Sequence, residues 1–529
     1  MTPLDCQAHL RCGGIDLPLH GVDVTRRIEQ ALQDGLPAQA LMRRAGLSVA
    51  RLALALAPHA DRIWIACGPG NNGGDGFEAA ALLQQAGKQV HITALGDATR
   101  RPADAASAFE RARAAGVQID TSLDRNAVAA SALAIDALFG LGQRSPPVGP
   151  LAAALVDALR CFNGRPTPRL AIDLPTGLDA ERGICAAVAA QATDTLTLLT
   201  LKPGLFTAQG RDHAGRVWFD DLGAEAAGPN AFVHSDSACA FLGGGAGAAR
   251  LRDAPRRHQQ HKGSFGDVVV VGGAPGMAGA ALLAARAAVI AGAGRVVACL
   301  LDPSAPALDI VWPELMLRRD AWRNPEVLAA STVVCGCGGG EAIASVLPAV
   351  LSRAARLVLD ADALNAVAAD PALQSLLHAR GARGLATVLT PHPLEAARLA
   401  GLADASAIQN DRLRHAQDLA ERWNCVVLLK GSGSVVAAPG LPPRINGSGN
   451  ARLASAGTGD VLAGWLGGLW SALGAAATEG GLQGLVQAAC WLHGQAAEDG
   501  RETAQNATAS APPQRNILHA TALIERLSF

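Results

Sequence analysis

The chain of 529 residues carries almost equal numbers of basic and acidic side chains, 45 Lys and Arg against 46 Asp and Glu, for a formal net charge of −1. It contains no block of basic residues and no interleaving of basic with aromatic residues, so the usual signature of a nucleic-acid-binding protein is absent. Half of the residues are hydrophobic. Because one hydrophobic core seldom serves more than about 250–300 residues, we expect two domains.

The cysteines indicate a reducing compartment. Eleven of them are scattered along the chain, and the one close pair, Cys335 and Cys337, has no second pair at metal-site spacing. This pattern is typical of buried free thiols in the cytoplasm. Charged residues such as Asp5, Arg11 and Asp16 interrupt any signal-peptide core near the N-terminus. We therefore expect a cytoplasmic protein.

Strands and helices alternate in the first half of the chain. Apolar, β-branched runs predict strands at 63–66, 90–94, 133–139, 170–174 and 196–201, and alanine-rich stretches such as 78–86 and 104–115 predict helices. Such alternation is typical of parallel sheets in α/β folds. From about residue 221 to residue 260 the pattern gives way to Gly, Ala and Pro and then to basic and polar residues. We place the boundary there, with a first domain at 1–225, a linker at 226–260 and a second domain at 261–529.

The alternation resumes in the second half. Strands are expected at 268–271, 295–301, 332–335, 357–359, 387–389 and 426–429, with helices such as 278–293 and 394–402 between them. The two halves share no repeat, so we expect two different α/β domains. The uncharged segment 461–478 approaches the length of a membrane span, but its many glycines and alanines make it only modestly hydrophobic. We expect a buried helix there and no membrane partner.

A glycine-rich stretch follows the first strand and reads Cys67-Gly-Pro-Gly-Asn-Asn-Gly-Gly-Asp-Gly76. Its glycines allow a tight turn and a close approach to a ligand, while two carboxamides and one carboxylate offer oxygen ligands. A turn without a ligand would not need the two asparagines and the aspartate. The stretch also contains the GxGxxG spacing of dinucleotide folds, which is weak evidence by itself. We interpret it as a loop that binds a nucleotide or a phosphate.

Two further strands of the first half end in acids, Asp136 and Asp173. Because ligands of open parallel sheets bind outside the carboxyl ends of the strands, we expect these acids and the glycine-rich loop to converge. Oxygen donors without His or Cys favour a hard cation such as K⁺, Na⁺ or Mg²⁺, and Asn72, Asp136 and Thr176 would form part of its shell. Asp75 and Asp173 would then bind substrate or move protons.

Comparable segments follow strands in the second half, at 272–280, 360–365 and 390–395. The first is a second glycine-rich loop suited to phosphates, and the last places His392 between two prolines. Lys430 ends another strand, where its ammonium can meet a nucleotide's phosphates. At 456–460 the chain reads Ala-Gly-Thr-Gly-Asp. Backbone N–H groups at such a helix start form an anion hole, and Asp460 is suited to act as general base on a hydroxyl below a phosphoryl group.

These motifs together resemble the bifunctional NAD(P)H-hydrate repair enzymes, in which an NAD(P)HX epimerase is fused to an ADP- or ATP-dependent NAD(P)HX dehydratase. The resemblance spans nearly the whole chain. On the epimerase side it rests on Leu41-Met-Arg-Arg-Ala-Gly46, on Asn-Asn-Gly-Gly-Asp at 71–75, on 136–140, on 173–177 and on Lys202-Pro-Gly-Leu205. On the dehydratase side it rests on 261–266, 272–280, 360–365, 390–395, 430–433 and 457–460.

For the first domain, the resemblance implies a Rossmann-like, three-layer α/β fold that interconverts the R and S hydrates NADHX and NADPHX. It implies K⁺ bound by Asn72, Asp136 and Thr176. Loss of hydroxide from the hydrated ring leaves an iminium-like cation that water can rejoin from either face, so an acid–base carboxylate is needed, and Asp173 is our candidate. The residues implied to hold the hydrate are Asn71, Asn72, Gly73, Gly74, Asp75, Gly140, Leu141, Gly142, Gln143, Arg144, Ser145, Pro146 and Asp173.

For the second domain, the resemblance implies a ribokinase-like α/β fold with Asp460 as the base. This domain would phosphorylate the S hydrate with Mg²⁺ and ADP or ATP, and would then expel phosphate, a better leaving group than hydroxide. The epimerase-first order resembles bacterial fusions, which implies ADP. The residues implied to touch the hydrate are Ala280, Gly338, His392 and Asp460. Those implied to bind the nucleotide are Lys430, Gly431, Ser432, Gly433, Ser434 and Gly459. A homo-oligomer is compatible with the sequence, which contains no coiled-coil heptads.

Two stretches depart from the family pattern. Residues 335–340 read Cys-Gly-Cys-Gly-Gly-Gly where Gly-Pro-Gly-Leu-Gly is usual, so Cys337 and Gly339 replace a stiff proline and an apolar leucine. We expect the added flexibility to weaken substrate binding around Gly338. Before the anion hole, Gly449-Asn-Ala-Arg-Leu-Ala454 replaces Gly-Asn-Pro-Gly-Met-Ala. No role for Arg452 follows from the sequence.

Three alternative interpretations stay open. The second domain could be a small-molecule kinase of ribokinase type, which would accumulate a stable phosphorylated product. The first domain could be part of a redox enzyme that uses the glycine-rich loop for a dinucleotide, with Asp97 as the ribose-binding acid, although the two asparagines and Asp75 would crowd a pyrophosphate. It could also be a catalytically silent binding module, which the acids Asp136 and Asp173 disfavour.

Overall fold

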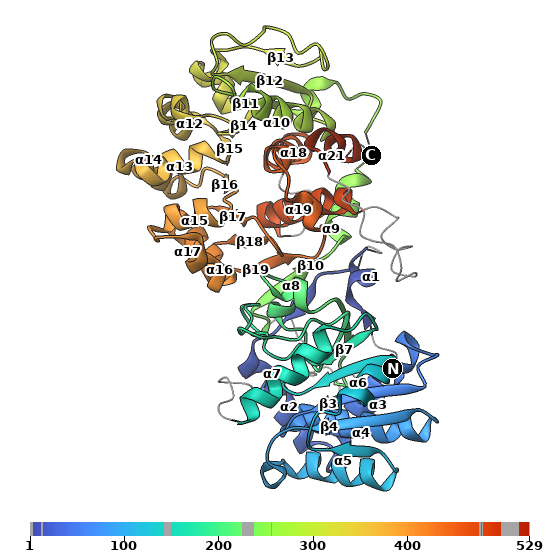
Figure 1. Ribbon diagram of the computed structural model, residues 1–529. Coiled ribbons are helices and arrows are strands. Elements are labelled where there is room, and N and C mark those ends of the chain that lie inside the picture. Colours follow the sequence, from blue (N-terminus) through green and yellow to red (C-terminus); the bar gives the residue numbers. More distant parts are fainter. Residues whose placement is uncertain are drawn as a thin grey trace. The chain divides into compact units, whose positions relative to one another are not determined.

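The computed structural model describes residues 4–11, 14–141, 150–224, 237–254, 256–474, 478, 480–498 and 518–527. Contacts within the chain divide it into two compact units, Met1–His9 with Leu17–Phe241 and Leu10–Asp16 with Leu242–Phe529. Each unit contains a mainly parallel sheet with helices packed on it (Figure 1). The α/β class predicted for both halves is therefore confirmed, whereas the domain limits 1–225, 226–260 and 261–529 stay a prediction.

The sheet of the first unit has eight strands in the order β1-β9-β8-β7-β6-β3-β4-β5. All neighbours are parallel except β1 and β9. Since β3 pairs with β4 on one side and with β6 on the other, the chain changes direction across the sheet at β3, which is where ligands bind in open α/β sheets. The strands of this unit are β1 (Leu4–Asp5), β2 (Leu17–Leu19), β3 (Arg62–Cys67), β4 (Gln89–Ala94), β5 (Gln118–Asp120), β6 (Leu133–Ala137), β7 (Arg169–Ile172), β8 (Asp194–Leu198) and β9 (Arg216–Asp220).

Helices cover both faces of the first sheet because successive strand residues point to opposite sides. Ile63 and Ile65 of β3 pack in one core with α2 to α5, whereas Trp64 and Ala66 pack in another with α6 and α7. This arrangement is Rossmann-like, as predicted. The helices up to the end of this unit are α1 (Cys6–Arg11), α2 (Val22–Asp34), α3 (Ala40–Leu56), α4 (Asn71–Gln85), α5 (Ala103–Ala114), α6 (Arg125–Ala130), α7 (Pro150–Asn163) and α8 (Gly210–His213), with 3₁₀ turns η1 (Ala98–Arg100) and η2 (Pro203–Leu205).

The glycine-rich stretch differs from its prediction as a loop. Only Gly68 to Gly70 form a turn, and helix α4 begins at Asn71. Glycines inside the helix allow close packing rather than chain reversal. A Cβ on Gly73 would lie 2.0 Å from the carbonyl oxygen of Gly68, and a Cβ on Gly76 would lie 2.5 Å from the Cβ of Ala137. The helix N-terminus is therefore pressed against the end of β6, where the acids lie.

The sheet of the second unit runs in the order β13-β12-β11-β14-β15-β16-β17-β18-β19-β10. The strands from β13 to β17 are parallel, and β17, β18 and β19 are antiparallel to one another. The six strands predicted for this half are confirmed, but the β18–β19 hairpin was not predicted. The strands are β10 (Ala240–Gly243), β11 (Asp267–Gly272), β12 (Arg295–Leu300), β13 (Met316–Leu317), β14 (Thr332–Cys335), β15 (Arg356–Leu359), β16 (Thr387–Leu389), β17 (Val426–Leu429), β18 (Val435–Ala438) and β19 (Leu441–Asn446).

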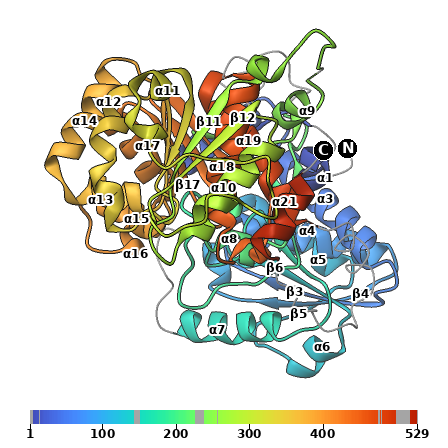
Figure 2. The same ribbon diagram turned by 90° about the horizontal axis from the view of Figure 1, so that it is seen from above.

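The second sheet also has a helical layer on each face, seen on its two sides in Figures 1 and 2. Val268 and Val270 of β11 pack with α10, α18, α19 and α21, and Val269 and Val271 pack with the helices from α11 to α17. The helices are α9 (Ala246–Arg252), α10 (Ala278–Ile290), α11 (Pro325–Ala330), α12 (Leu347–Arg353), α13 (Asp362–Ala369), α14 (Pro371–Ala382), α15 (Pro393–Ala400), α16 (Ala405–Asn410), α17 (Arg412–Trp423), α18 (Thr458–Leu473), α19 (Gly481–Ala497) and α21 (Ala520–Leu527), with 3₁₀ turns η5 (Lys262–Phe265), η6 (Ala321–Arg323), η7 (Glu341–Ser345) and η8 (Ala451–Leu453).

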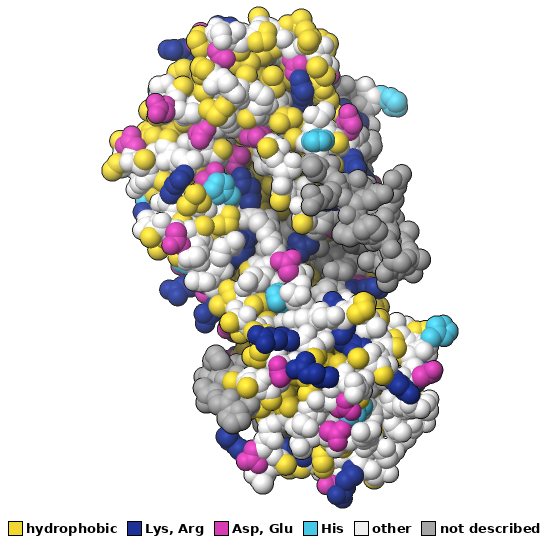
Figure 3. Space-filling view, viewed as in Figure 1, with side chains coloured by type: hydrophobic (Ala, Val, Ile, Leu, Met, Phe, Trp, Pro, Cys, Tyr) yellow, Lys and Arg dark blue, Asp and Glu magenta, His cyan; other side chains and the backbone are white. Residues whose placement is uncertain are grey.

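Helix α18 is the buried helix predicted from the uncharged segment near residue 461. Its glycines bring it close to α10, because a Cβ on Gly464 would lie 1.9 Å from the carbonyl oxygen of Ala284. None of the described helices combines the length and hydrophobicity that crossing a membrane requires. On the face of each unit that Figure 3 shows, acidic and basic side chains are interspersed.

The contact between α10 and α18 provides a test of this packing. We expect Gly464→Ala to lower the free energy of unfolding by about 1–3 kcal/mol, because the added methyl group meets a backbone carbonyl that cannot move freely. Gly279→Ala on the partner helix is the matched control, since its added Cβ meets nothing within 4 Å, and it should be neutral or stabilising by about 0.5–1 kcal/mol. Urea unfolding followed by tryptophan fluorescence measures both. Equal stability of the two variants would contradict this packing.

Candidate active sites

A cavity of about 780 Å³ opens at the carboxyl ends of the strands of the first unit. Its walls come from α2, from the start of α4 and from the segments after β6, β7 and β8. The predicted site residues that line it are Asn71, Asn72, Asp75, Gly140, Leu141 and Asp173. Gly73 and Gly74 do not line it, because Gly73 packs against the backbone of Gly68, and Gly74 packs against Met42 and Ala105. Gly142, Gln143, Arg144, Ser145 and Pro146 lie outside the described residues.

Asp173 follows β7 in a left-handed backbone conformation, with φ of 66°. Its carboxylate Oδ1 lies 2.5 Å from Nζ of Lys202. That ammonium is fully buried and also donates to the Oγ1 of Thr197 and to the carbonyl oxygen of Leu198. A buried lysine satisfied by three acceptors is a fixed positive charge, so it orients the carboxylate toward the cavity.

Asp136 and Thr176 form a second polar cluster behind the cavity wall. The Asp136 carboxylate is buried and accepts hydrogen bonds from the backbone N–H and the hydroxyl of Thr176, each at 2.8 Å, and from the N–H of Leu138 at 3.1 Å. Burial raises the pKa of Asp136 to about 6, although these hydrogen bonds oppose the rise. A carboxylate offers about four lone-pair positions, so one stays open to a cation.

Asn72 lies beside this cluster in the first turn of α4. Its Nδ2 is buried and has no hydrogen-bond partner among the described residues. A Cβ on Gly140 would meet Oδ1 of Asn72 at 3.2 Å and Oδ2 of Asp173 at 2.9 Å, so a glycine is needed where these two side chains meet. The structure thus brings together Asn72, Gly140 and Asp173, as the sequence predicted.

Two more carboxyl groups share the cavity. Burial, followed by the charges of Asp173, Glu29 and Glu78, raises the pKa of Asp75 well above its ordinary value. Glu29 also lines the cavity, and burial and Asp173 raise its pKa. Sequence reasoning missed Glu29 because it lies on a helix, far from any glycine-rich motif. Its spacing of four residues from Thr25 is the one signal that could have placed both on one helix face.

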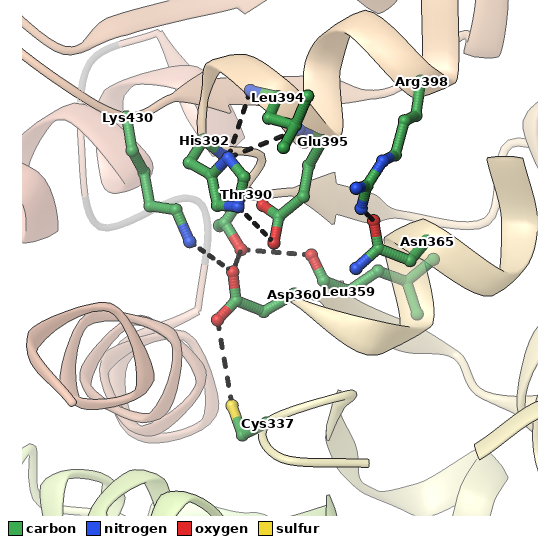
Figure 4. Close-up of polar contacts among 10 residues, drawn as sticks. All are labelled: Cys337, Leu359, Asp360, Asn365, Thr390, His392, Leu394, Glu395, Arg398 and Lys430. Carbon is green, nitrogen blue, oxygen red and sulfur yellow. Dashed lines mark hydrogen bonds and ion pairs between the residues drawn. The ribbon is translucent and has the colours of Figure 1, made fainter. Parts of the chain in front are cut away.

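In the second unit, Asp360 is the centre of the polar network drawn in Figure 4. It follows β15 and is buried, and its Oδ1 accepts from Nζ of Lys430 at 2.6 Å and from the hydroxyl of Thr390 at 2.8 Å. Burial lowers the pKa of Lys430, but the charges of Asp360 and Glu395 outweigh it and the net pKa is raised. The lysine is therefore a permanent cation.

Asp460 faces the same network from the first turn of α18. Its carboxylate, the carboxylate of Asp360 and the Sγ of Cys337 lie within 4.8 Å of one another. Burial and the charge of Asp360 raise the pKa of Asp460 to about 6, while a hydrogen bond from Cys337 and the charge of Lys430 lower it. The predicted base is thus held where it can take up a proton near neutral pH.

His392 has a structural role that its sequence position did not indicate. It is the N-cap of α15, and its Nδ1 accepts hydrogen bonds from the N–H groups of Leu394 and Glu395. Its Nε2 lies 3.1 Å from Oε1 of Glu395, whose pKa burial raises to about 7. Because 47% of the His392 side chain stays exposed, the ring can cap the helix and still present an edge to a ligand.

The glycine and lysine residues predicted to hold substrates also lie near one another. A Cβ on Gly338 would meet the Cβ of Ala280 at 2.9 Å, so these two predicted hydrate contacts are neighbours. A Cβ on Gly459 would lie 3.4 Å from Nζ of Lys430, which places the anion hole beside the lysine. Gly338 takes φ of 57°, a conformation that most residues avoid.

Arg412, which was not predicted as a functional residue, packs against the turn at 431–434. The guanidinium is buried and donates to the carbonyl oxygens of Leu429 and Lys430. A Cβ on Gly431 would lie 3.0 Å from Nη1 of Arg412, so the guanidinium contacts this glycine. Within the turn, the hydroxyl of Ser434 donates to the carbonyl oxygen of Gly431. The predicted nucleotide segment therefore has a fixed backbone.

Arg452, for which the sequence offered no role, interacts with the end of a helix. Its Nη1 donates to the carbonyl oxygen of Ala497, the last residue of α19. The amide of Asn450 donates to the same carbonyl at 3.1 Å. Cations near a helix C-terminus are stabilising because they satisfy its last carbonyl groups.

Asp97, the acid of the redox interpretation, caps η1 by accepting hydrogen bonds from the N–H and the hydroxyl of Thr99.

Comparison with known proteins decides the family. Residues 268–518 match the family described as NAD(P)H-hydrate dehydratase, and residues 38–204 match the one described as YjeF-related protein N-terminus. The Escherichia coli bifunctional NAD(P)H-hydrate repair enzyme Nnr is 37% identical over 457 residues, which cover 84% of each chain. The chain belongs to the bifunctional NAD(P)H-hydrate repair enzymes. The predicted family and its two activities, epimerase and dehydratase, are thereby confirmed.

One further relative is also described as bifunctional, and a solved structure matches about half of this chain. The Coxiella burnetii bifunctional NAD(P)H-hydrate repair enzyme Nnr is 32% identical over 504 residues, 93% of this chain and 98% of that one. A solved structure of the Bacillus subtilis ADP/ATP-dependent NAD(P)H-hydrate dehydratase, co-crystallised with ATP and Mg²⁺, is 26% identical and covers 53% of this chain and 94% of that one, with a TM-score of 0.38. Family membership removes the kinase, redox and silent-module interpretations of the sequence.

The buried pair of Lys202 and Asp173 provides a test of the first site. We expect Lys202→Met to lower the free energy of unfolding of the first unit by about 3–5 kcal/mol, because it leaves a carboxylate without its counter-charge. Adding Asp173→Asn should recover part of this loss, since the amide carries no charge. Chemical unfolding of the wild type, both single variants and the double variant measures the coupling. Additive effects would show that the pair does not stabilise the site.

Proposed function

We propose that the first unit interconverts the R and S hydrates through Asp173, and that the second unit phosphorylates the S hydrate with Asp460 as the base. The first assignment is supported mainly by the position of Asp173, which lines the cavity and is held there by the buried ammonium of Lys202. The second is supported by Asp460, which lies beside Lys430 and the anion hole.

In the epimerase reaction, the hydroxyl of the hydrate lies on a ring carbon bonded to the ring nitrogen. When the hydroxyl takes a proton from a carboxyl group of the cavity and leaves as water, the nitrogen lone pair forms an iminium-like cation. Asp173 takes a proton from a water molecule, whose oxygen then attacks the ring carbon, and attack on the opposite face inverts the configuration. The ion pair with Lys202 holds the carboxylate in position at the cavity wall.

We propose that the hydrate is held by Asn71, Asn72, Asp75, Gly140 and Leu141, which line a cavity of about 780 Å³. This volume is within the range of about 300–1,000 Å³ that is usual for small-molecule sites. Gly73 and Gly74 act indirectly, through the packing of α4. The segment from Gly142 to Pro146 is proposed as the remaining part of the site.

We propose K⁺ at Asn72, Asp136 and Thr176. The donor set fits a hard cation because it consists of oxygens, and because burial of the Asp136 carboxylate calls for a compensating positive charge. When bound, K⁺ would supply that charge. The hydrogen bonds from Thr176 and Leu138 hold the carboxylate in place whether or not the ion is there.

An isosteric variant tests the role of Asp173. We expect Asp173→Asn to slow interconversion of the R and S hydrates by about 10²–10⁴-fold, because the amide cannot accept the proton. The measurement is chromatographic separation of the two hydrates without ADP or ATP. Asp212→Asn, an exposed change on α8, is the matched control and should behave as wild type. Unchanged interconversion by Asp173→Asn would refute the assignment.

For the dehydratase reaction, we propose that the adenine nucleotide binds at Lys430, Gly431, Ser432, Gly433, Ser434 and Gly459, and that the hydrate contacts Ala280, Gly338 and His392. Asp460 takes the proton of the hydrate's hydroxyl group while the oxygen of that hydroxyl attacks the terminal phosphoryl group of the nucleotide. Lys430 and the N–H groups at the start of α18 stabilise the negative charge that develops. Phosphate then leaves, and loss of a proton from the neighbouring ring carbon restores the reduced nicotinamide.

We propose Mg²⁺ as the ion that accompanies the nucleotide. The carboxylates at this site are the hard oxygen donors that Mg²⁺ accepts, and it usually binds through substrate phosphates. The Bacillus subtilis relative was co-crystallised with ATP and Mg²⁺. We further propose ADP as the preferred donor, on the resemblance to bacterial fusions, and a cytoplasmic location, on the scattered cysteines.

The pKa of Asp460 sets a pH dependence. Since burial raises it to about 6 and the base must be ionised, we expect the dehydration rate to be constant above neutral pH and to fall about tenfold per pH unit well below 6. Cys337→Ala should move this limb to higher pH, because the Cys337 hydrogen bond lowers the pKa of Asp460. Rate profiles of the two proteins at saturating hydrate check this, and coincident profiles would contradict it.

A further inference from the structure

Helix α2 presents a polar face to the cavity of the first unit. Thr25, Glu29 and Gln33 are spaced four residues apart and all line the cavity, so they lie on one side of the helix. The core side of the helix is formed by Ile28 and Leu32, which are 2% and 5% exposed. Glu29 is therefore not needed to pack α2 against the sheet.

The polar neighbours of Glu29 on this helix are engaged in holding it in place. The hydroxyl of Thr25 lies 2.8 Å from the hydroxyl of Thr200 and donates to the carbonyl oxygen of Gly21. Nη2 of Arg26 donates to the carbonyl oxygen of Leu141 at 2.9 Å. Within the described part of the chain, the Glu29 carboxylate has no hydrogen-bond partner. Its burial favours the neutral form, although the charges of Lys202 and Arg26 oppose this.

Charges on three elements act on Glu29. Asp173, at the end of β7, raises its pKa after burial, while Lys202 and Arg26 lower it. In turn, Glu29 raises the pKa of Asp75 on α4. Two carboxyl groups that interact in one cavity favour a state in which one holds a proton and the other is ionised. Asp173 is ion-paired with Lys202, whereas burial and the charge of Asp173 raise the pKa of Glu29, so Glu29 is suited to carry the proton.

We propose that Glu29 is a second acid–base group of the epimerase, acting from α2 on the hydroxyl of the hydrate while Asp173 acts from the strand end. The inference rests on the proposed role of Asp173. An epimerase that removes a hydroxyl and adds water needs a proton donor for the first event and an acceptor for the second, and two carboxyl groups on different walls of one cavity can supply both.

The protons balance across one inversion. Glu29 gives its proton to the hydroxyl as the carbon–oxygen bond breaks, and the bonding pair leaves with the water while the nitrogen lone pair forms the iminium bond. A second water attacks the other face, the iminium electrons return to nitrogen, and Asp173 takes the released proton. The enzyme then carries its proton on Asp173, which is the state required for the reverse inversion.

The test uses the full-length chain and the NADH hydrates without ADP or ATP. We expect Glu29→Gln to lower kcat for interconversion by about 10²–10⁴-fold, with KM changed less than about threefold if binding is unaffected. Glu29→Ala should regain part of its rate when acetate is added, because a small acid can enter the vacated space. A residue with a purely structural role would not respond to acetate.

Controls separate the possible failures. Gln30 is an exposed neighbour whose amide donates a hydrogen bond to Asp34, so Gln30→Ala should interconvert the hydrates at the wild-type rate. Dehydration of the S hydrate with ADP should be normal in every variant. A wild-type kcat in Glu29→Gln, or a raised KM with unchanged kcat, would overturn the proposed role of Glu29. The proposed role of Asp173 would not be affected. Full activity of Asp173→Asn would instead overturn the proposed function itself. Absence of acetate rescue together with a large kcat loss would assign Glu29 a structural role.

Discussion

In each unit a lysine ammonium is held against an aspartate that follows a parallel strand, Lys202 with Asp173 at 2.5 Å and Lys430 with Asp360 at 2.6 Å. Both pairs lie among other carboxyl groups, and each of the four side chains is at most 18% exposed. Without the lysine, several negative charges would face one another without a counter-charge, which is costly in a partly buried site. The two lysines therefore make it possible to gather acids at each site.

The parallel sheets explain why these acids meet. Strands that run in the same direction end at the same edge, so Asp136 and Asp173 in the first unit, and Asp360 in the second, lie beside helix N-termini. Glycines at positions such as Gly73 and Gly464 allow α4 and α18 to press against neighbouring backbone. The N-terminal N–H groups of these helices are thereby brought to the strand ends, where they favour anionic groups.

The sequence was sufficient for the parts of the fold that have a strong local pattern. The buried strands, such as β3 and β14, read as continuous apolar runs, and Asp136 and Asp173 were visible as acids within such runs. The prediction of a loop at 71–76 was wrong, because α4 begins at Asn71. In a sequence, glycines that allow close helix packing cannot be told from glycines that form a turn. The β18–β19 hairpin was not predicted because its strands are short and follow a glycine-rich segment, whose pattern is equally typical of a ligand-binding loop and of the turn before a hairpin.

Other features depended on tertiary contacts that no local pattern reveals. Arg412 donates from a helix to the carbonyl oxygen of Lys430, next to the turn at 431–434, and Arg452 donates to the end of α19. Glu29 is one charged residue among several on an amphipathic helix, and only the cavity distinguishes it from Asp23 or Arg27. The capping role of His392 also follows from geometry, since the same residue could have been an exposed loop histidine.

Two sites in one chain act on one pool of hydrates. The most direct measurement starts from a mixture of R and S hydrates of NADH with ADP and Mg²⁺ and follows recovery of the reduced nicotinamide absorbance. We expect the wild type to restore the whole pool, and Asp173→Asn to restore the S fraction at the normal rate and then stop. Complete and rapid recovery by the variant, or recovery of the S fraction alone by the wild type, would contradict it.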